Sequence, residues 1–109
     1  MGSAKLGELE LLVLLAILRL GRGNAHPVSI VDEIQGCTGR SVVRATVYVV
    51  LQRLEKKALV TSHLGEPIPE RGGRPRRIVE ILPAGIDQVR ETRAGLVRMW
   101  GGIEVLDRG

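Results

Sequence analysis

Aromatic side chains are nearly absent from this sequence of 109 residues, which contains no Phe, one Tyr and one Trp. A chain of this length is expected to form one modest domain, so its core must be built from aliphatic side chains. The single cysteine, Cys37, excludes an internal disulfide and suits a reducing, cytoplasmic environment. We expect Cys37 to be buried or half-buried.

Motifs for metals, membranes and catalysis are also missing. Cys37, His26 and His63 are the only soft metal ligands and no two have a ligand spacing, so no metal or other cofactor is expected. The apolar run at residues 11–18 is too short for a bilayer, which takes roughly 20 residues. No Ser/His/Asp arrangement and no Gly-rich loop between strand and helix occurs, so we expect no enzyme. The nearby carboxylates are interpreted as solvated helix faces: Glu8 with Glu10, and Asp32 with Glu33.

Positive charge, by contrast, is concentrated in the middle of the chain. Nine basic and three acidic residues lie between Arg40 and Arg77, which gives this region a charge of +6. Because the whole chain carries +4, the remainder carries −2. This uneven distribution of charge predicts that residues 40–77 face an anionic partner.

The centre of the basic region, residues 40–60, has the periodicity of a helix with two faces. The expected inward face is Val43, Val47, Val50, Leu51, Leu54 and Ala58. The expected outward face is Ala45, Thr46, Val49, Gln52, Arg53 and Lys56, with Tyr48 at the boundary. Short side chains, an amide and cations in this order suit a helix in the major groove of DNA. Taken alone, the stretch also fits an amphipathic core helix with an ordinary surface.

Two further helices are predicted before this one. Residues 6–20 form the first, and its all-apolar part cannot be buried on every side by so small a domain, so we expect it to meet a second subunit. Pro27 then opens a short helix at residues 28–35, which Gly36 is placed to end, and residues 37–39 form a turn. The inward stripe of this second helix is Val28, Val31 and Ile34. Together the three helices predict a helix-turn-helix.

Two strands and a last helix complete the predicted architecture. The strands are residues 59–64 and 76–82, and the Gly-, Pro- and Arg-rich segment 65–75 between them is either a surface loop or, after a helix-turn-helix, a wing. The last helix, residues 83–100, carries a heptad seam that suits packing on a partner's first helix. The seam residues are Leu82, Ile86, Val89, Arg93, Leu96, Trp100 and Ile103.

The expected fold is therefore mainly α with a small β-hairpin (α+β), a winged helix-turn-helix in the order helix, helix, helix, strand, wing, strand, helix. Residues 1–82 would be the DNA-binding domain and residues 83–109 a C-terminal dimerisation helix and tail. We find no internal repeat and no linker between domains.

In this order the pieces resemble the PadR family of bacterial transcriptional regulators, in its short form with a single C-terminal dimerisation helix. The resemblance rests on Leu-Gly-Glu-Leu-Glu at 6–10, Val-Tyr-x-x-Leu-x-Arg-Leu-Glu-x-x-x-Leu-Val at 47–60, Gly-Glu-Pro-x-Pro-Glu-Arg-Gly-Gly-Arg at 65–74 and Pro-Ala-Gly at 83–85. It implies a dimeric winged-helix DNA-binding protein, commonly a repressor, and several such proteins respond to a small hydrophobic or phenolic ligand near the dimer interface. Val43 and Leu82 stand where the family has capping Ser or Thr, so those two helix caps are expected to be missing.

From these observations we expect a homodimeric, sequence-specific transcriptional regulator, a repressor, that binds double-stranded DNA at an inverted-repeat operator. Bases would be read by Ala45, Thr46, Val49 and Gln52. Phosphates would be held, or the groove flanked, by Arg44, Tyr48, Arg53 and Lys56. The wing would meet the DNA backbone or minor groove through Arg71, Arg74, Arg76 and Arg77.

The expected dimer interface is Leu9, Leu12, Leu15, Ile86, Val89, Arg93, Leu96 and Trp100. Trp100 could also stack on a small aromatic effector. The alternative function is a winged-helix module whose basic face docks an acidic protein. The Gly/Arg-rich wing and the small residues on the outward helix face favour DNA.

Overall fold

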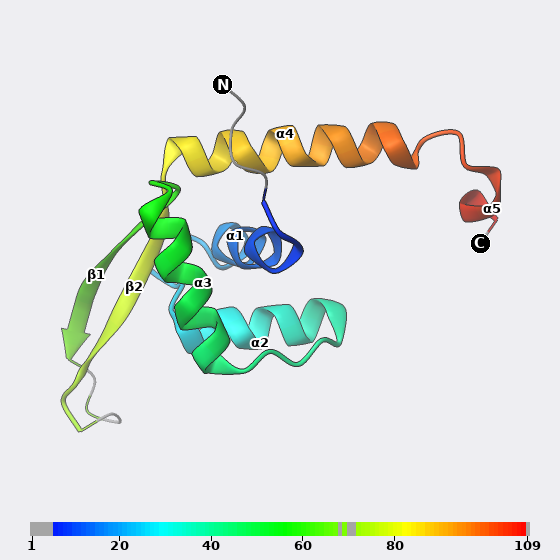
Figure 1. Ribbon diagram of the computed structural model, residues 1–109. Coiled ribbons are helices and arrows are strands. Elements are labelled where there is room, and N and C mark those ends of the chain that lie inside the picture. The colour runs from blue at the N-terminus through cyan, green and yellow to red at the C-terminus, as the bar shows by residue number, and fades with distance from the viewer. Residues whose placement is uncertain (1–5, 68, 70–71, 109) are drawn as a thin grey trace.

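Five helices and one antiparallel hairpin make up the computed structural model, which describes residues 6–67, 69 and 72–108. The elements in chain order are α1 (Glu8–Leu20), α2 (Pro27–Thr38), α3 (Arg44–Lys56), β1 (Val60–Pro67), β2 (Pro75–Ile81), α4 (Pro83–Trp100) and α5 (Glu104–Asp107). Figure 1 shows α1, α2 and α3 packed together, the hairpin beside α3, and α4 crossing α1 before its second half extends past the rest of the molecule. The predicted α+β winged helix-turn-helix is confirmed.

The core is aliphatic, as the near absence of aromatic residues predicted. It joins α1, α2, α3, the hairpin and the first half of α4, and it contains neither Tyr48 nor Trp100. Its buried members are Val13, Leu14, Ala16, Ile17, Ala25, Ile30, Ile34, Val47, Val50, Leu51, Leu54, Leu59, Val60, Val79 and Val89.

The inward face of α3 agrees with the prediction in its middle and differs at both ends. Its buried residues are Val47, Val50, Leu51 and Leu54. Val43 is 68% exposed because it precedes the helix as an N-cap, and it makes no side-chain capping bond. Ala58 follows the end of the helix in the left-handed conformation, with φ of 59°, and is also exposed. Helical periodicity applies only inside the helix, so the prediction was wrong for these two residues.

The second helix is longer than predicted. It continues through Gly36 and Cys37 to Thr38, and Gly39 ends it in the left-handed conformation with φ of 74°. An interior Gly destabilises a helix by only about 1 kcal/mol, which a left-handed Gly cap three residues later can offset. Cys37 therefore lies on an exposed helix surface, so its predicted burial was wrong.

The inward stripe of α2 was only partly predicted. Ile34 is buried as expected, but Ile30 is the other buried aliphatic residue, and Val28 and Val31 are half-buried. The helix begins at Pro27 with His26 as N-cap, where the Ser29 N–H donates to His26 Nδ1 at 3.3 Å and the His26 N–H donates to Ser29 Oγ at 3.0 Å.

The hairpin is anchored at its base and irregular toward its tip. Ser62 pairs with Val79 and Leu64 with Arg77, but the register shifts between Leu64 and Pro67. On the other edge of β2, the Val79 N–H donates to the Ala25 carbonyl oxygen at 2.8 Å, so the loop between α1 and α2 holds the base of the hairpin. The strands reach further toward the tip than predicted and leave a shorter loop.

An ion pair between buried Glu10 and half-buried Lys57 joins the start of α1 to the end of α3. Glu10 is only 7% exposed, so its interpretation as a solvated residue was wrong. Lys57 Nζ donates to both Glu10 carboxylate oxygens at 2.8 and 3.0 Å, and the Gly7 N–H donates to Oε1 at 2.9 Å. Burial alone would raise the pKa of Glu10, but these hydrogen bonds and the charges of Lys57 and Arg53 hold that pKa below its usual value.

The last long helix has the predicted bounds, Pro83–Trp100, and its N-cap Leu82 makes no side-chain bond. Gly101 ends it, and the short α5 that follows was not predicted. Gly85 allows α4 to begin against the base of the hairpin. A Cβ at this position would lie 2.4 Å from the Leu59 carbonyl oxygen and 2.7 Å from Ile81 Cγ1.

Candidate nucleic-acid interface

The outward face of α3 is open along its whole length. The four predicted base-reading residues are all exposed, with Val49 at 47%. Ala45 and Thr46 lie in the first turn of the helix, and Gln52 lies one turn beyond Val49. Because Ala45 and Thr46 are short and exposed, the N-terminal half of α3 can approach the base edges in a groove closely.

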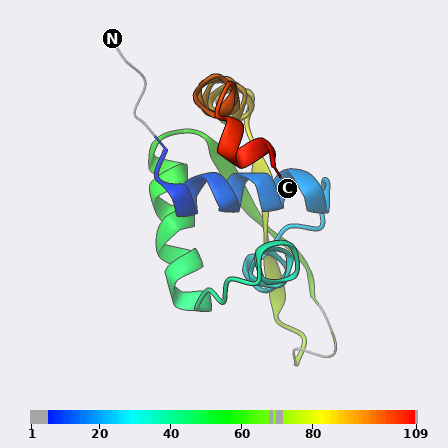
Figure 2. The same cartoon turned by 90° about the vertical axis from the view of Figure 1, so that its right-hand side faces the viewer.

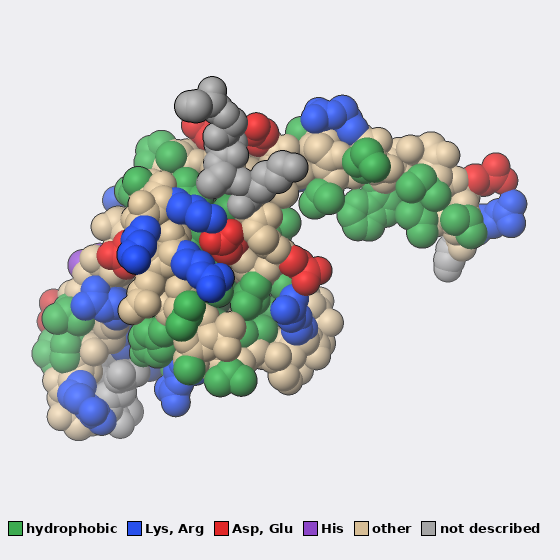
Figure 3. Space-filling model, viewed as in Figure 1, with side chains coloured by type: hydrophobic (Ala, Val, Ile, Leu, Met, Phe, Trp, Pro, Cys, Tyr) green, Lys and Arg blue, Asp and Glu red, His purple; other side chains and the backbone are tan. Residues whose placement is uncertain are grey.

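Cations surround this face. Arg44, Arg53 and Lys56 are exposed on α3, and Tyr48 is 46% exposed between them and the hairpin. Figure 3 shows blue Lys and Arg side chains gathered over α3 and along the hairpin, with few red carboxylates among them. Part of the positive region of the sequence thus forms a positive surface on α3 and the hairpin, whereas Lys57 pairs with Glu10 and Arg40 with Glu8.

Arg77 lies on the face of the hairpin that packs toward α3. Its Nη1 donates to Ser62 Oγ at 3.0 Å, and Ser62 Oγ in turn donates to Glu55 Oε1 at 3.3 Å. A depression of about 260 Å³ separates α3 from the hairpin here, and Tyr48 and Gln52 form its α3 side. Arg77 therefore extends the positive surface of α3 onto the hairpin.

Arg76 points to the opposite face, because successive side chains of a strand alternate. It is half-buried beside His26, His63 and Glu66, and its buried Nε has no hydrogen-bond partner within the described residues. The prediction did not separate the two arginines, although strand alternation would have done so. Arg74 is exposed near the tip of the hairpin. Arg71, the remaining predicted wing residue, lies outside the described residues.

A second surface, the α1–α4 groove, is apolar and lies away from the basic one. It has a volume of about 350 Å³ and is lined by Leu11, Leu15, Leu18, Ile86, Val89, Arg90, Arg93 and Leu96. Five predicted interface residues are brought together here: Leu15, Ile86, Val89, Arg93 and Leu96.

Three predicted interface residues lie outside the groove. Leu9 and Leu12 are partly buried against the core, and Trp100 lies beyond the groove at the end of α4, where it is 60% exposed. Leu11 and Leu18 line the groove but were not among the predicted interface residues. They lie four residues before Leu15 and three after it, as neighbours on one helical face do. The equally apolar Leu12 has the same kind of spacing, so helical spacing alone does not choose between them.

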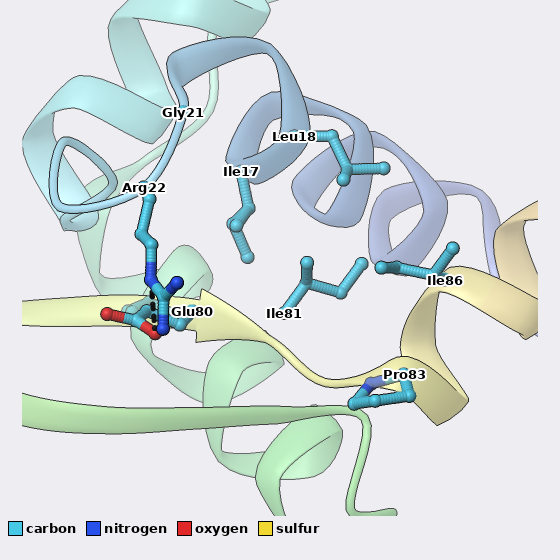
Figure 4. Close-up of a pocket in the computed structure, with 9 residues that line it drawn as sticks. Ile17, Leu18, Gly21, Arg22, Glu80, Ile81, Pro83 and Ile86 are labelled. Carbon is cyan, nitrogen blue, oxygen red and sulfur yellow. Dashed lines mark ion pairs between the residues drawn. The ribbon is translucent and has the colours of Figure 1, made fainter.

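A neighbouring depression connects this groove to the hairpin. It has a volume of about 370 Å³, and Figure 4 shows Ile17, Ile81 and Ile86 converging on it from α1, β2 and α4. On its rim Arg22 Nε and Glu80 Oε1 form an ion pair at 3.6 Å. The hairpin, α1 and α4 thus meet around one apolar junction.

Two general properties of the described residues bear on function. No three His, Cys, Asp or Glu side chains among them gather closely enough to hold a metal ion. None of the helices in this part of the chain combines the length and the apolar character that crossing a membrane requires.

The order of elements and the basic face define a winged helix-turn-helix protein. The family model described as the transcriptional regulator PadR-like family matches residues 14–91. The chain therefore belongs to the PadR-like family of transcriptional regulators, which is a family of DNA-binding proteins. No curated protein matches the chain.

Solved structures of similar fold agree with this assignment. A PadR-like regulator from Bacillus cereus has a TM-score of 0.73 and 19% identity, covering 93% of this chain and 92% of that one. A PadR family regulator from Eggerthella lenta has a TM-score of 0.68 and 25% identity, covering 94% and 88%. BpsR from Bordetella bronchiseptica, whose DNA binding is regulated by 6-hydroxynicotinic acid, has a TM-score of 0.64 and 21% identity, covering 94% and 71%.

Proposed function

We propose that this protein is a homodimeric repressor that binds an inverted-repeat operator in double-stranded DNA. The observation that carries the proposal is the exposed face of α3, where small residues and an amide are followed by cations beside a basic hairpin. In this arrangement Ala45, Thr46, Val49 and Gln52 read bases, because the major groove admits a helix and presents a distinct pattern at each base pair.

The phosphate contacts come from the cations around that face. They are Arg44, Arg53 and Lys56 on α3, joined by the Tyr48 hydroxyl, and Arg71, Arg74 and Arg77 on the wing. Arg76 lies on the opposite face of the hairpin and is left out of this set. An acidic protein partner could use the same charges, but it would not need the short side chains at the start of α3. Membership of a DNA-binding family further favours DNA over such a partner.

Residues 83–109 would serve as the dimerisation element of this regulator and residues 1–82 as its DNA-binding domain. The support is the unpartnered α1–α4 groove together with the seam on α4, of which Leu96 and Trp100 are 42% and 60% exposed. Large exposed apolar residues in a continuous row are typical of protein–protein interfaces. A two-fold dimer would bind inverted half-sites whose centres are about 10–10.5 bp apart, or a multiple of that distance.

Two substitutions test the division between base and phosphate contacts. Gln52→Ala should lower affinity for the operator by roughly 1–3 kcal/mol and hardly change binding to random DNA, because its amide would pair with a base edge. Arg74→Ala should weaken binding to both duplexes alike and reduce the salt dependence by about one unit of slope, because a phosphate contact carries no sequence information.

The measurement is a pair of salt-titrated binding curves, on operator and scrambled duplex, for the wild type and both variants. Footprinting the protein on its own upstream region would first supply the operator. An equal loss on both duplexes for both variants would contradict the assigned roles. If the wild type preferred no duplex over an acidic polypeptide, the protein-docking function would replace DNA binding.

We further propose that a small aromatic effector contacts Trp100. The exposed indole offers a flat apolar face for stacking, and the relative BpsR is regulated by an aromatic acid. Titration with a set of flat aromatic compounds should shift or quench the emission of this single tryptophan and change operator affinity in parallel. If no compound changes the emission, Trp100 is a residue of the dimer seam only.

A further inference from the structure

The last described segment of the chain has nothing to cover its apolar side chains. Every residue from 101 to 108 is exposed, including Val105 at 71% and Leu106 at 56%. A helix as short as α5, with four residues, is not stable in water by itself. Its apolar pair therefore requires a surface to pack on.

The same molecule has an apolar depression that no side chain fills. It lies between α1 and α2, with Leu12, Leu15 and Ala16 on one side and Ile34 and Cys37 on the other. Its volume of about 130 Å³ is well below the roughly 300 Å³ at which ligand pockets begin. The depression therefore suits an aliphatic side chain and not a small-molecule ligand.

The two features cannot meet within one chain. In Figure 1, α5 lies at the far end of α4, well separated from α1 and α2 of its own chain. After the turn at Gly102, whose φ is 80°, α5 lies on the same side of α4 as α1 and α2, as Figure 2 shows with α4 seen end-on. A second copy, with its α4 laid over the α1–α4 groove, would carry its own α5 toward this side of α1.

The depression is also continuous with the groove. Leu15 lines both of them, with the groove on one side of its side chain and the depression on the other. A partner helix laid over the groove would therefore contact Leu15, which the depression also uses. On its rim Arg19 Nε donates to Glu33 Oε2 at 2.7 Å, which leaves the charges satisfied and the floor apolar.

We propose that α5 of one copy docks Val105 and Leu106 into the α1–α2 depression of the second copy. The inference rests on the proposed homodimer and adds a second contact to it. This contact joins the C-terminal segment of one chain to α2 of the other, and α2 is part of the helix-turn-helix. The arm formed by α4 and α5 therefore has two roles. It holds the two chains together, and it sets the position of the partner's DNA-binding domain.

The single cysteine of the chain makes the contact directly testable, because Cys37 lines the depression and is exposed. One chain would carry Leu106→Cys together with Cys37→Ser, and the other would be the wild type with a different affinity tag. Co-expressed and mildly oxidised, the two should give a disulfide-linked heterodimer on a non-reducing gel. Each chain then holds one thiol, so this species can only join position 106 of one chain to Cys37 of the other.

The matched control replaces Leu106→Cys with Glu104→Cys, on the opposite side of the same short helix. We expect at least tenfold less heterodimer from it. As a second measurement, Leu106→Asp in the otherwise native chain should leave the dimer intact in sedimentation and raise the rate of Cys37 alkylation at least tenfold.

Three outcomes separate this proposal from the proposed function. A dimer that binds operator, but gives no more heterodimer from position 106 than from position 104, overturns the α5 contact alone. An alkylation rate of Cys37 that does not respond to Leu106→Asp overturns it as well. A wild type that sediments as a monomer overturns the homodimer and the α5 contact together.

Discussion

Replacing Leu96 with Asp is expected to turn the protein into a monomer and to lower its affinity for operator DNA at least about a hundredfold. Leu96 lies in the α1–α4 groove and is 42% exposed in the single chain. A two-fold dimer would bury two such carboxylates in an apolar interface, and a penalty of about 3 kcal/mol corresponds to that factor. Sedimentation velocity over a range of concentrations, together with operator binding, measures both effects.

The matched control is Ala94→Asp, which adds the same charge to an exposed position of α4 outside the groove. This variant should remain a dimer and bind the operator like the wild type. If Leu96→Asp also remained a dimer at micromolar concentration, the groove would not be the dimer interface. Because the substitution leaves the basic face unchanged, loss of DNA binding without loss of the dimer would also count against this explanation.

Replacing Gly85 with Ala should have the largest effect on folding, a loss of about 3 kcal/mol in the free energy of unfolding. The added Cβ would lie 2.4 Å from the Leu59 carbonyl oxygen and 2.7 Å from Ile81 Cγ1. A backbone oxygen cannot rotate away as a side chain does, so α4 would have to move off the base of the hairpin. Urea unfolding followed by circular dichroism measures the change.

Gly95→Ala is the control in the same helix and should have the opposite sign. A Cβ at Gly95 would have Arg98 Nη2 as its nearest neighbour, at 4.0 Å, so the substitution meets no obstacle. Replacing an unobstructed interior Gly by Ala stabilises a helix by roughly 0.5–1 kcal/mol. If both substitutions destabilised the protein equally, the close approach at Gly85 would not explain the first result.

The parts of the fold that could be predicted are those determined by local sequence. Alternating and helical patterns predicted the order of the elements and the bounds of α4 at residues 83–100. Rules that use only neighbouring residues failed where the burial of a side chain depends on a contact with a residue far along the chain. Glu10 is buried because Lys57, far along the chain, reaches both of its oxygens, and no pattern around Glu10 reports that contact.

The candidate site likewise has one part that could be predicted from the sequence and one that could not. The exposed face of α3 could be predicted, because Val47, Val50 and Leu54 are spaced as one buried stripe and leave the opposite side open. The exposed face of α1 could not be predicted, because a run that is apolar at every position has no periodicity that distinguishes a buried face from an exposed one. This is why Leu9 and Leu12, which pack against the core, were predicted for the interface, whereas Leu11 and Leu18, which line the α1–α4 groove, were not.

The register shift between Leu64 and Pro67 gives the two parts of the hairpin different evolutionary freedom. At its base, β2 is bonded on one edge to β1 and on the other to the Ala25 carbonyl, so a change there reaches the core. Beyond the shift, no described residue up to Pro75 is buried, and inserted residues add little loop-closure entropy. Wing length can therefore change with little effect on the scaffold, and the reach of the wing toward a partner can vary without loss of stability.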